Sequence, residues 1–562
     1  MRLLNVTVRN YRSLKEFDLA LGNINAIVGP NNVGKSNFVN LLYTLLGKNW
    51  LNRDDFSLND IYRKDDDLEI GIDLFFEDGP KYKKIKSADP VTIERLSYKY
   101  TKYKIGPAKG QRRLEQACLK HDGEAITVQA SALKRGESLK FEPIVSIPME
   151  VREQIPLIYI SPRRNLDSQL PDGRYSMLRQ LLEDIDKDFH DPDNLIAIAE
   201  GEPDEGLSRS DKFARLMSEM VQLLKTDNLA ELESDIKENA LKLLGLDPSL
   251  DSEQLDFYFA PFSTKMFYQS LQLMVKENGY EINALELGGG FQNALIMSIM
   301  QAFEQRRKSG AVFLIEEPEM YLHPQMQRAL FKTLQNISSK NQVIYTTHSA
   351  NFVSVPEFNS VVILRRTKEE GTKPNLSSLE PKEIDTNSLI KDLDPERNEM
   401  FFASKILFVE GDTEKMSLPV YAERLGLDID KENASIIEVG GKRALLKFAK
   451  IAASFNIPVG IIHDEDGEKG TSDEDNKTLN GDIEGFCSEN SKQCWKLDKN
   501  YEEEFEKLLN EDKWQEVCQK YPKKQYGKPG RARMIALDDN IDFPEKLKEA
   551  LLWLCNKDGV GS

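Results

Sequence analysis

The sequence has no apolar run long enough to cross a bilayer and few cysteines. A membrane-spanning helix needs about 20 consecutive apolar residues, so we expect no such helix. The 562 residues include five cysteines, without a CxxC pair, which disfavours disulfide scaffolds and cysteine-based zinc sites. The opening stretch MRLLNVTVRN alternates apolar and polar residues, so it predicts a strand rather than a signal peptide. Together these features predict a protein of the reducing cytoplasm.

An excess of positive charge is also missing, since the formal net charge is −18. Proteins that coat nucleic acid nonspecifically are usually basic overall, so the total disfavours that class. The negative net charge is still compatible with local basic segments that contact DNA. It also suits an enzyme that holds divalent metals with carboxylates. With 40% hydrophobic and 30% charged residues, the chain resembles ordinary globular proteins. Its length predicts about two to four domains.

The apolar patterns divide the chain into four segments. Residues 1–170 and 251–385 contain strand-like runs and predict two parts of one domain. Between them, residues 171–250 hold helical patterns with apolar residues at three- and four-residue spacing, which predicts a helical insertion. Residues 400–562 alternate apolar strands and helices, the pattern of an α/β domain with a parallel sheet.

A glycine-rich loop, GPNNVGKS, lies between a short apolar strand run and a helical pattern. It fits the phosphate-binding motif GxxxxGK[ST] in the strand–loop–helix context that the motif requires. In that motif, backbone N–H groups surround phosphate, the lysine reaches the β- and γ-phosphates, and the serine ligates Mg²⁺. We therefore predict a site for ATP with Mg²⁺ rather than a chance turn. The predicted nucleotide-binding residues of this loop are Gly29, Asn32, Gly34, Lys35 and Ser36.

Two later segments hold further candidates for the same site. AVFLIEEPE delivers Glu316 and Glu317 to the end of an apolar strand, where α/β sheets bind ligands. Glu316 would hold Mg²⁺ and Glu317 would polarise the attacking water. TTHS places His348 after another strand, where it would contact the γ-phosphate. Taken alone, each segment has a structural alternative: the two glutamates could form a solvated strand end, and the histidine could be purely structural.

A glycine triplet in LELGGGFQNAL opens a helix, so that Gly289 is a candidate to present its N–H to phosphate. The order of P-loop, glycine signature, acidic strand end and TxHS resembles an ABC-type ATPase of the SMC/RecF branch. In that family the signature of one subunit closes on the ATP of another, so the resemblance implies a homodimer or higher homo-oligomer. Leu287 or Gly288 replaces the family's serine, and Glu316 replaces its aspartate, which would fit slow or switch-like hydrolysis.

Two strand ends of the C-terminal segment carry carboxylates. KILFVEGDTE ends its apolar run at Glu410, and Glu414 lies four residues further, on the same face of a helix. VGIIHDEDG ends in Asp464 and Asp466, which share a direction in an extended chain, while Glu465 points away. If the strands are parallel, these acids meet at one edge and suit two Mg²⁺ or Mn²⁺ ions for phosphodiester chemistry. For either strand alone, acids that only solvate a strand end are the alternative.

An EG strand followed by a DxD strand resembles a Toprim domain. With the ATPase segments before it, the chain resembles the OLD (overcoming lysogenization defect) family of nucleases, which includes the nuclease of the Gabija anti-phage system. EGDTE, EVGGK and HDEDG carry the likeness. The resemblance implies an α/β protein with an ABC-type ATPase head, a helical insertion that serves dimerisation, and a C-terminal Toprim domain with a parallel sheet.

In function, the resemblance implies an ATP-binding, divalent-metal-dependent DNA endonuclease or nickase in anti-phage defence or DNA processing. DNA is the implied partner, and a UvrD-type helicase is a further candidate. The alternative is a non-cleaving SMC/RecF-like DNA-binding ATPase in recombination or repair. A Toprim domain that no longer cleaves would lack Glu410 or an aspartate of the DxD pair, and this sequence has all three.

The family also uses an acid late in the Toprim domain and a lysine beyond it. The stretch LDKNYEEEF makes Glu502 the candidate metal ligand by resemblance, although acids on a helix usually form a solvated face. Its rivals nearby are Asp498, Glu503 and Glu504. YGKPGRAR offers Lys528, which would stabilise negative charge near the scissile phosphate. The surrounding basic run, residues 519–533, contains no acid and predicts a phosphate-contacting surface.

Overall fold

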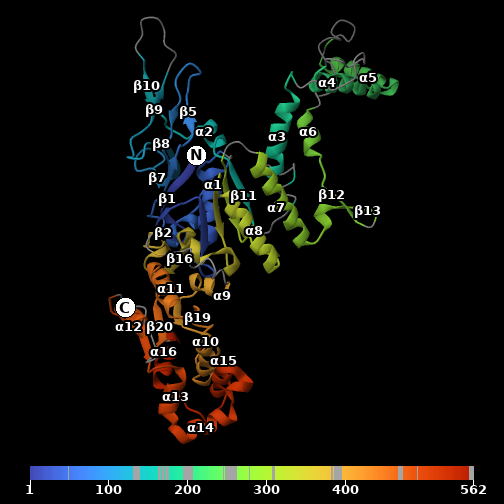
Figure 1. Ribbon diagram of the computed structural model, residues 1–562. Helices are drawn as coiled ribbons and strands as arrows, with labels where there is room; N and C mark the ends of the chain where they lie inside the picture. The colour runs from blue at the N-terminus through green and yellow to red at the C-terminus, as the bar shows by residue number, and fades with distance from the viewer. Residues whose placement is uncertain are drawn as a thin grey trace. The chain divides into compact units, whose positions relative to one another are not determined.

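The computed structural model divides the chain into two compact units, Met1–Pro162 with Ser309–Ser562, and Arg163–Lys308 (Figure 1). The described residues are 1–47, 50–130, 139–162, 166, 170, 176–193, 207–244, 246, 263–277, 279–306, 310–380, 384, 395–465, 473–489 and 492–555. Among them, no helix is both long and apolar enough to span a membrane.

The first unit begins with an antiparallel sheet in the order β2-β1-β4-β7-β8. Its strands are β1 (Arg2–Tyr11), β2 (Leu14–Ala20), β4 (Ile70–Glu77), β7 (Arg95–Lys102) and β8 (Arg112–Leu119). Burial along β4 alternates with a period of two, as expected for a strand with one face in a core. Smaller elements accompany this sheet: β5 (Lys81–Tyr82), β6 (Val91–Thr92), β9 (Thr127–Gln129), β10 (Phe141–Pro143) and α2 (Met149–Glu153).

A second sheet, in the order β11-β14-β15-β3-β16-β17, carries the predicted nucleotide loop. Its strands are β3 (Ile24–Val28), β11 (Leu157–Ile160), β14 (Val312–Glu316), β15 (Gln342–Thr346), β16 (Val361–Thr367) and β17 (Gly371–Asn375). The first five in spatial order are parallel and β17 is antiparallel. Every residue of β14 and β15 is buried, which explains why the interior of each strand is apolar.

Helix α1 (Lys35–Leu46) packs between the two sheets. It shares one apolar cluster with residues of both, and the Phe38 ring lies 5.1 Å from that of Phe17 on β2. At the other end of α1, Tyr98 Oη donates to Leu45 O at 3.3 Å. Helix α8 (Pro324–Ile337) joins β14 to β15. Because α1 is fixed along its length, the loop at its N-terminus has a rigid support.

The C-terminal part of the first unit contains a four-stranded parallel sheet in the order β19-β18-β20-β21. Its strands are β18 (Lys405–Val409), β19 (Ala434–Glu438), β20 (Val459–Asp464) and β21 (Gln493–Leu497). The helices here are α9 (Pro395–Asn398), α10 (Asp412–Arg424), α11 (Lys442–Ser454), α12 (Asp473–Glu489), α13 (Tyr501–Leu509), α14 (Glu511–Lys520), α15 (Lys523–Ala536) and α16 (Glu545–Cys555). The predicted α/β class with a parallel C-terminal sheet is thus confirmed.

The second unit contains the helices predicted as an insertion. They are α3 (Met177–Phe189), α4 (Arg209–Leu224) and α5 (Asp227–Leu243). Ser176, Ser208 and Thr226 cap them, each accepting a backbone N–H of the first turn. The unit continues through α6 (Thr264–Gln269), β12 (Met274–Glu277), β13 (Tyr280–Asn283) and α7 (Gly289–Arg306). The domain boundaries expected from the sequence, and the dimerisation role of the insertion, stay predictions.

Candidate functional site

The P-loop joins the end of β3 to the start of α1 in a conformation that depends on its residue types. Gly29 and Gly34 have φ angles of 146° and 114°, and Asn32 has a φ of 64°. Most residues are strained at positive φ because of their Cβ atom, and glycine and asparagine tolerate such angles best. A Cβ on Gly34 would also lie 2.5 Å from Ser13 Oγ. The loop geometry therefore requires the glycines that the motif contains.

Lys35 is folded back onto this loop. Its Nζ donates to the carbonyl oxygens of Gly29 at 2.6 Å and Pro30 at 3.0 Å. Burial lowers the pKa of Lys35 to about 8, although Glu317 and Glu319 act in the opposite direction. A bound phosphate would offer this buried ammonium charged oxygens in place of carbonyls, which is a stronger interaction.

Glu316 and Glu317 lie beside this loop because β14, β15 and β3 are neighbouring parallel strands. The Glu316 carboxylate accepts a hydrogen bond from Tyr159 Oη at 2.7 Å. Burial raises the pKa of Glu316, while hydrogen bonds from Tyr159 and Ser36 favour its ionised form. The structure therefore brings together the two residues predicted to hold Mg²⁺, Ser36 and Glu316.

Glu317 and His348 face each other at the same edge. Glu317 has a φ of 46°, and its N–H donates to Thr346 O at 3.0 Å. His348 Nε2 lies 4.0 Å from Glu317 Oε1. Burial and the Lys35 charge lower the pKa of His348, with Glu317 opposing. The neutral imidazole is therefore favoured. Gly289 begins α7 in the second unit, so its place beside a nucleotide stays a prediction.

The second candidate site is the carboxyl edge of the β19-β18-β20-β21 sheet. Glu410 follows β18, Asp464 ends β20, and the two strands are parallel neighbours. Glu410 Oε1 accepts the backbone N–H of Asp464 at 2.8 Å. The predicted convergence of these two strand ends is thus present. Asp466 lies outside the described residues.

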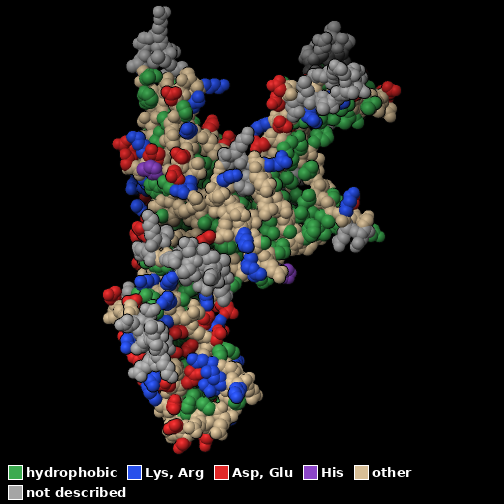
Figure 2. Space-filling view, viewed as in Figure 1, with side chains coloured by type: hydrophobic (Ala, Val, Ile, Leu, Met, Phe, Trp, Pro, Cys, Tyr) green, Lys and Arg blue, Asp and Glu red, His purple; other side chains and the backbone are tan. Residues whose placement is uncertain are grey.

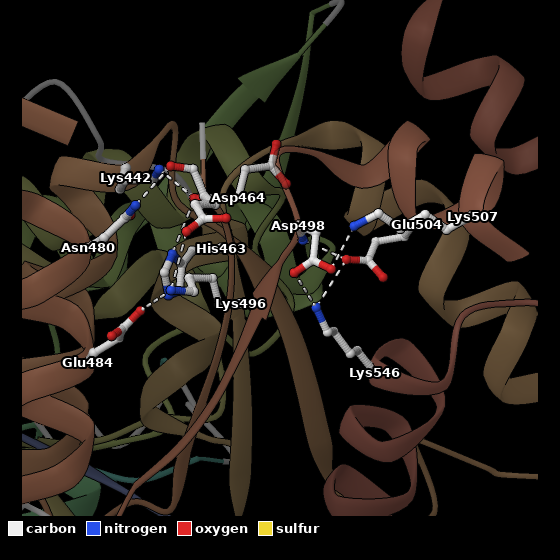
Figure 3. Close-up of polar contacts among 11 residues, drawn as sticks. Lys442, His463, Asp464, Asn480, Glu484, Lys496, Asp498, Glu504, Lys507 and Lys546 are labelled. Carbon is white, nitrogen blue, oxygen red and sulfur yellow. Dashed lines mark hydrogen bonds and ion pairs between the residues drawn. The ribbon is translucent and has the colours of Figure 1, made fainter. Parts of the chain in front are cut away.

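Lys442 ties three strand ends together at this edge. It is the first residue of α11, directly after Gly440 and Gly441 at the end of β19. Its Nζ donates to Asp464 O at 2.6 Å (Figure 3). The same Nζ lies 3.8 Å from Glu410 Oε1. The side chain is buried. Sequence reasoning assigned Lys442 no role, although a lysine after paired glycines at a strand end in EVGGK was the available signal.

Glu414 lies in the first turn of α10 and is only 6% exposed. Burial and the neighbouring Glu410 charge together raise the pKa of Glu414 to about 7, although its own N–H, Lys528 and the N–H of Gly411 act in the opposite direction. A buried carboxylate with another carboxylate beside it favours a bound cation, because the cation removes both penalties. The hard oxygen donors of Glu410, Glu414 and Asp464 therefore suit Mg²⁺ or Mn²⁺.

Lys528 and Glu502 are brought together across α13 and α15. Lys528 Nζ lies 3.3 Å from Glu502 Oε2, and Arg531 Nη2 lies 3.2 Å from Glu502 Oε1. Helix α15 is interrupted at Gly527, whose φ is 69°. Although burial acts in the other direction, Glu502, Asp464 and Glu414 raise the pKa of Lys528. Lys528 thus lies within electrostatic reach of the acidic edge.

The rival acids have other partners. Asp498 accepts from Lys507 at 2.7 Å and Lys546 at 2.9 Å, and Glu504 accepts from the same Lys546 at 3.1 Å (Figure 3). Hydrogen bonds from the two lysines lower the pKa of Asp498 to about 2. Glu503 lies 3.6 Å from Lys499. Of the four acids considered, the structure places Glu502 beside Lys528.

The metal set is incomplete in the part of the chain that the structure describes. No group of three histidine, cysteine, aspartate or glutamate side chains there converges tightly enough to hold a metal ion.

Figure 2 shows Lys and Arg side chains gathered over α15, with acidic side chains beside them. Lys520 of this basic run pairs with Asp538 at 2.6 Å, so part of its charge is neutralised within the domain.

Two known family profiles match the chain. One, described as an AAA ATPase domain, covers residues 1–353, and the other, the Toprim domain of overcoming-lysogenization-defect-like proteins, covers residues 401–466. The chain belongs to the AAA ATPase domain family and carries an OLD-like Toprim domain. The resemblance read from the motifs is confirmed.

Several curated proteins are similar to this AAA ATPase–Toprim chain over most of its length. The OLD nuclease of Thermus scotoductus is 28% identical over 477 residues, covering 83% of this chain and 82% of its own. Endonuclease GajA of Bacillus cereus (strain VD045) is 24% identical, covering 78% and 71%. The Old nuclease of Escherichia phage P2 is 21% identical, covering 83% and 77%. The similarity thus spans both the ATPase segments and the Toprim domain.

Proposed function

We propose that this protein is an ATP-binding, divalent-metal-dependent DNA endonuclease or nickase. The observation that carries the proposal is the joined strand ends of the Toprim sheet, where the Glu410 carboxylate accepts the Asp464 N–H at 2.8 Å and Glu414 lies buried beside them. The metal ligands that we propose are Glu410, Glu414, Asp464, Asp466 and Glu502. The names of the similar curated proteins support the same activity.

The carboxylates would hold two Mg²⁺ or Mn²⁺ ions, which activate water and neutralise charge at a phosphodiester. Glu410 is kept in place by its bond to the Asp464 backbone, and Lys442 fixes the same backbone from its other side. Lys528 supplies positive charge at the edge, where negative charge develops on the phosphate. Basic side chains of α15 would contact the DNA backbone.

In the ATPase domain, Lys35 and the P-loop N–H groups would bind the phosphates of ATP, and Ser36 with Glu316 would hold Mg²⁺. Glu317 would polarise water and His348 would contact the γ-phosphate, which their facing positions at the sheet edge support. Homodimerisation would bring Gly289 of a second subunit to the nucleotide. A role in anti-phage defence or DNA processing in the cytoplasm, with a UvrD-type helicase as partner, completes the proposal.

A plasmid-nicking assay tests the central claim. Supercoiled plasmid is incubated with the full chain and Mg²⁺, Mn²⁺ or Ca²⁺, with and without ATP. We expect Asp464→Ala to abolish metal-dependent cleavage while leaving ATP binding intact, and Lys35→Ala to abolish ATP binding. The exposed Asp482 on α12 provides a matched control, since Asp482→Ala should cleave like the wild type. Undiminished cleavage by Asp464→Ala would contradict the proposed metal site, and a wild type that binds DNA without cleaving it in any of these metals would favour the non-cleaving DNA-binding ATPase instead.

A further inference from the structure

Glu319 connects the ends of the two strands that carry the predicted ATPase residues. It lies in the turn after β14, and its Oε2 accepts from Thr347 Oγ1 at 3.0 Å. Its Oε1 accepts the backbone N–H of His348 at 2.6 Å. Both partners directly follow β15, the neighbour of β14. One carboxylate therefore holds the turn that presents His348.

A second contact closes the same turn from α8. Gln327 Oε1 accepts from Ser349 Oγ at 2.8 Å and Asn351 Nδ2 at 3.1 Å. The Gln327 amide also donates to Leu322 O at 3.0 Å. The segment after β15 is thus fixed on both sides of His348. Between these contacts the imidazole faces Glu317 at 4.0 Å.

A charged side chain such as that of Glu319 is not needed if its only task is to close this turn. Burial raises the pKa of Glu319, and hydrogen bonds from His348 N–H, its own N–H and Thr347 oppose that effect. An apolar or amide side chain would avoid the cost of placing a charge there. A carboxylate, however, accepts two hydrogen bonds at once from a backbone N–H and a hydroxyl, and the charged acceptor makes both bonds stronger.

We propose that Glu319 is a positioning residue, which holds His348 where its imidazole meets the γ-phosphate of ATP and so sets the rate of hydrolysis. The inference rests on the proposed ATP binding. Glu319 holds His348 through the backbone N–H of that residue. Its loss should therefore lower kcat for ATP hydrolysis and leave ATP affinity nearly unchanged.

The test measures ATP hydrolysis and ATP binding for the full-length wild type and for Glu319→Ala, Glu319→Gln and His348→Ala. We expect Glu319→Ala to lower kcat by about 10- to 100-fold, the usual cost of a misplaced catalytic group, with KM changed less than about threefold. Glu319→Gln keeps one carbonyl acceptor for the His348 N–H and should recover most of the rate. Glu357→Ala serves as the matched control, because Glu357 also accepts one side-chain hydrogen bond, from Gln335 at 2.8 Å, away from the turn.

The double variant Glu319→Ala/His348→Ala separates positioning from general stability. If Glu319 acts through His348, the double variant hydrolyses ATP no more slowly than His348→Ala alone. The inference is wrong if the rate losses of the two single variants multiply in the double variant, or if Glu319→Ala hydrolyses ATP at the wild-type rate. Should Glu319→Ala fail to fold, Thr347→Val removes one of the two contacts and should give an intermediate rate, whereas an unchanged rate contradicts the inference. A wild-type protein that binds no ATP defeats the proposed ATPase function itself.

Discussion

Glu414 gives a prediction whose sign is opposite to that of most carboxylates in folded proteins. In the metal-free protein, burial and the Glu410 charge raise the pKa of Glu414 from 4.5 to about 7. The folded state therefore holds the proton more tightly than the unfolded state. The stability that this proton contributes is fully present below pH 4.5, and it is lost as the pH rises through about 7.

The size of this loss follows from the pKa change. At about 1.4 kcal/mol per pKa unit, a rise of roughly 2.5 units corresponds to about 3 kcal/mol. The residue is 6% exposed, so solvent screens little of it. Glu414→Gln is neutral at every pH, and its amide can accept the Gly411 N–H and donate to Glu410. Its stability advantage over the wild type should grow from about 1 kcal/mol at pH 5 to about 3 kcal/mol at pH 8.

Urea unfolding in EDTA, followed by tryptophan fluorescence, measures this difference. Three of the four tryptophans, Trp495, Trp514 and Trp553, belong to the C-terminal sheet domain, while Trp50 is already 56% exposed in the folded protein, so the fluorescence change mainly reports unfolding of the C-terminal domain. The control is Glu423→Gln, an exposed acid on the same helix, which should show no pH-dependent advantage. If Glu414→Gln is as stable as the wild type at pH 8, or less stable, the argument that Glu414 is penalised in the metal-free edge is wrong.

Three further substitutions test other parts of the structure. Gly34→Ala places a Cβ 2.5 Å from Ser13 Oγ at a φ of 114°. We therefore expect the variant to lose binding of a fluorescent ATP analogue and to be destabilised by about 1–3 kcal/mol. Normal binding of the analogue would contradict the role of the loop geometry. Lys442→Met removes the donor at 2.6 Å from Asp464 O and should lower the free energy of unfolding by about 1–3 kcal/mol in denaturant titrations. Lys528→Met should reduce plasmid nicking about 100-fold with unchanged ATP hydrolysis, and equal nicking would remove Lys528 from the site.

The sequence alone predicted the α/β class, the parallel C-terminal sheet and the family. These features depend on local patterns, because apolar strands and glycines with positive φ are encoded within short segments. GPNNVGKS between strand and helix is such a segment, and Gly29 and Gly34 have the φ angles that the motif requires. The acids at the ends of β18 and β20 were found for the same reason, since Glu410 directly follows one buried strand and Asp464 ends the other.

Only the tertiary structure decided which side chains meet across the sheets. Tyr159 donates to Glu316 from 157 residues away, and no local pattern links them. Lys442 and Glu319 gained their roles from partners on neighbouring strands. Among the late acids, Glu502 lies beside Lys528, while Asp498 and Glu504 are paired with other lysines. Strand order and helix packing determine these pairs, and the periodicity of the sequence specifies neither the strand order nor the helix packing.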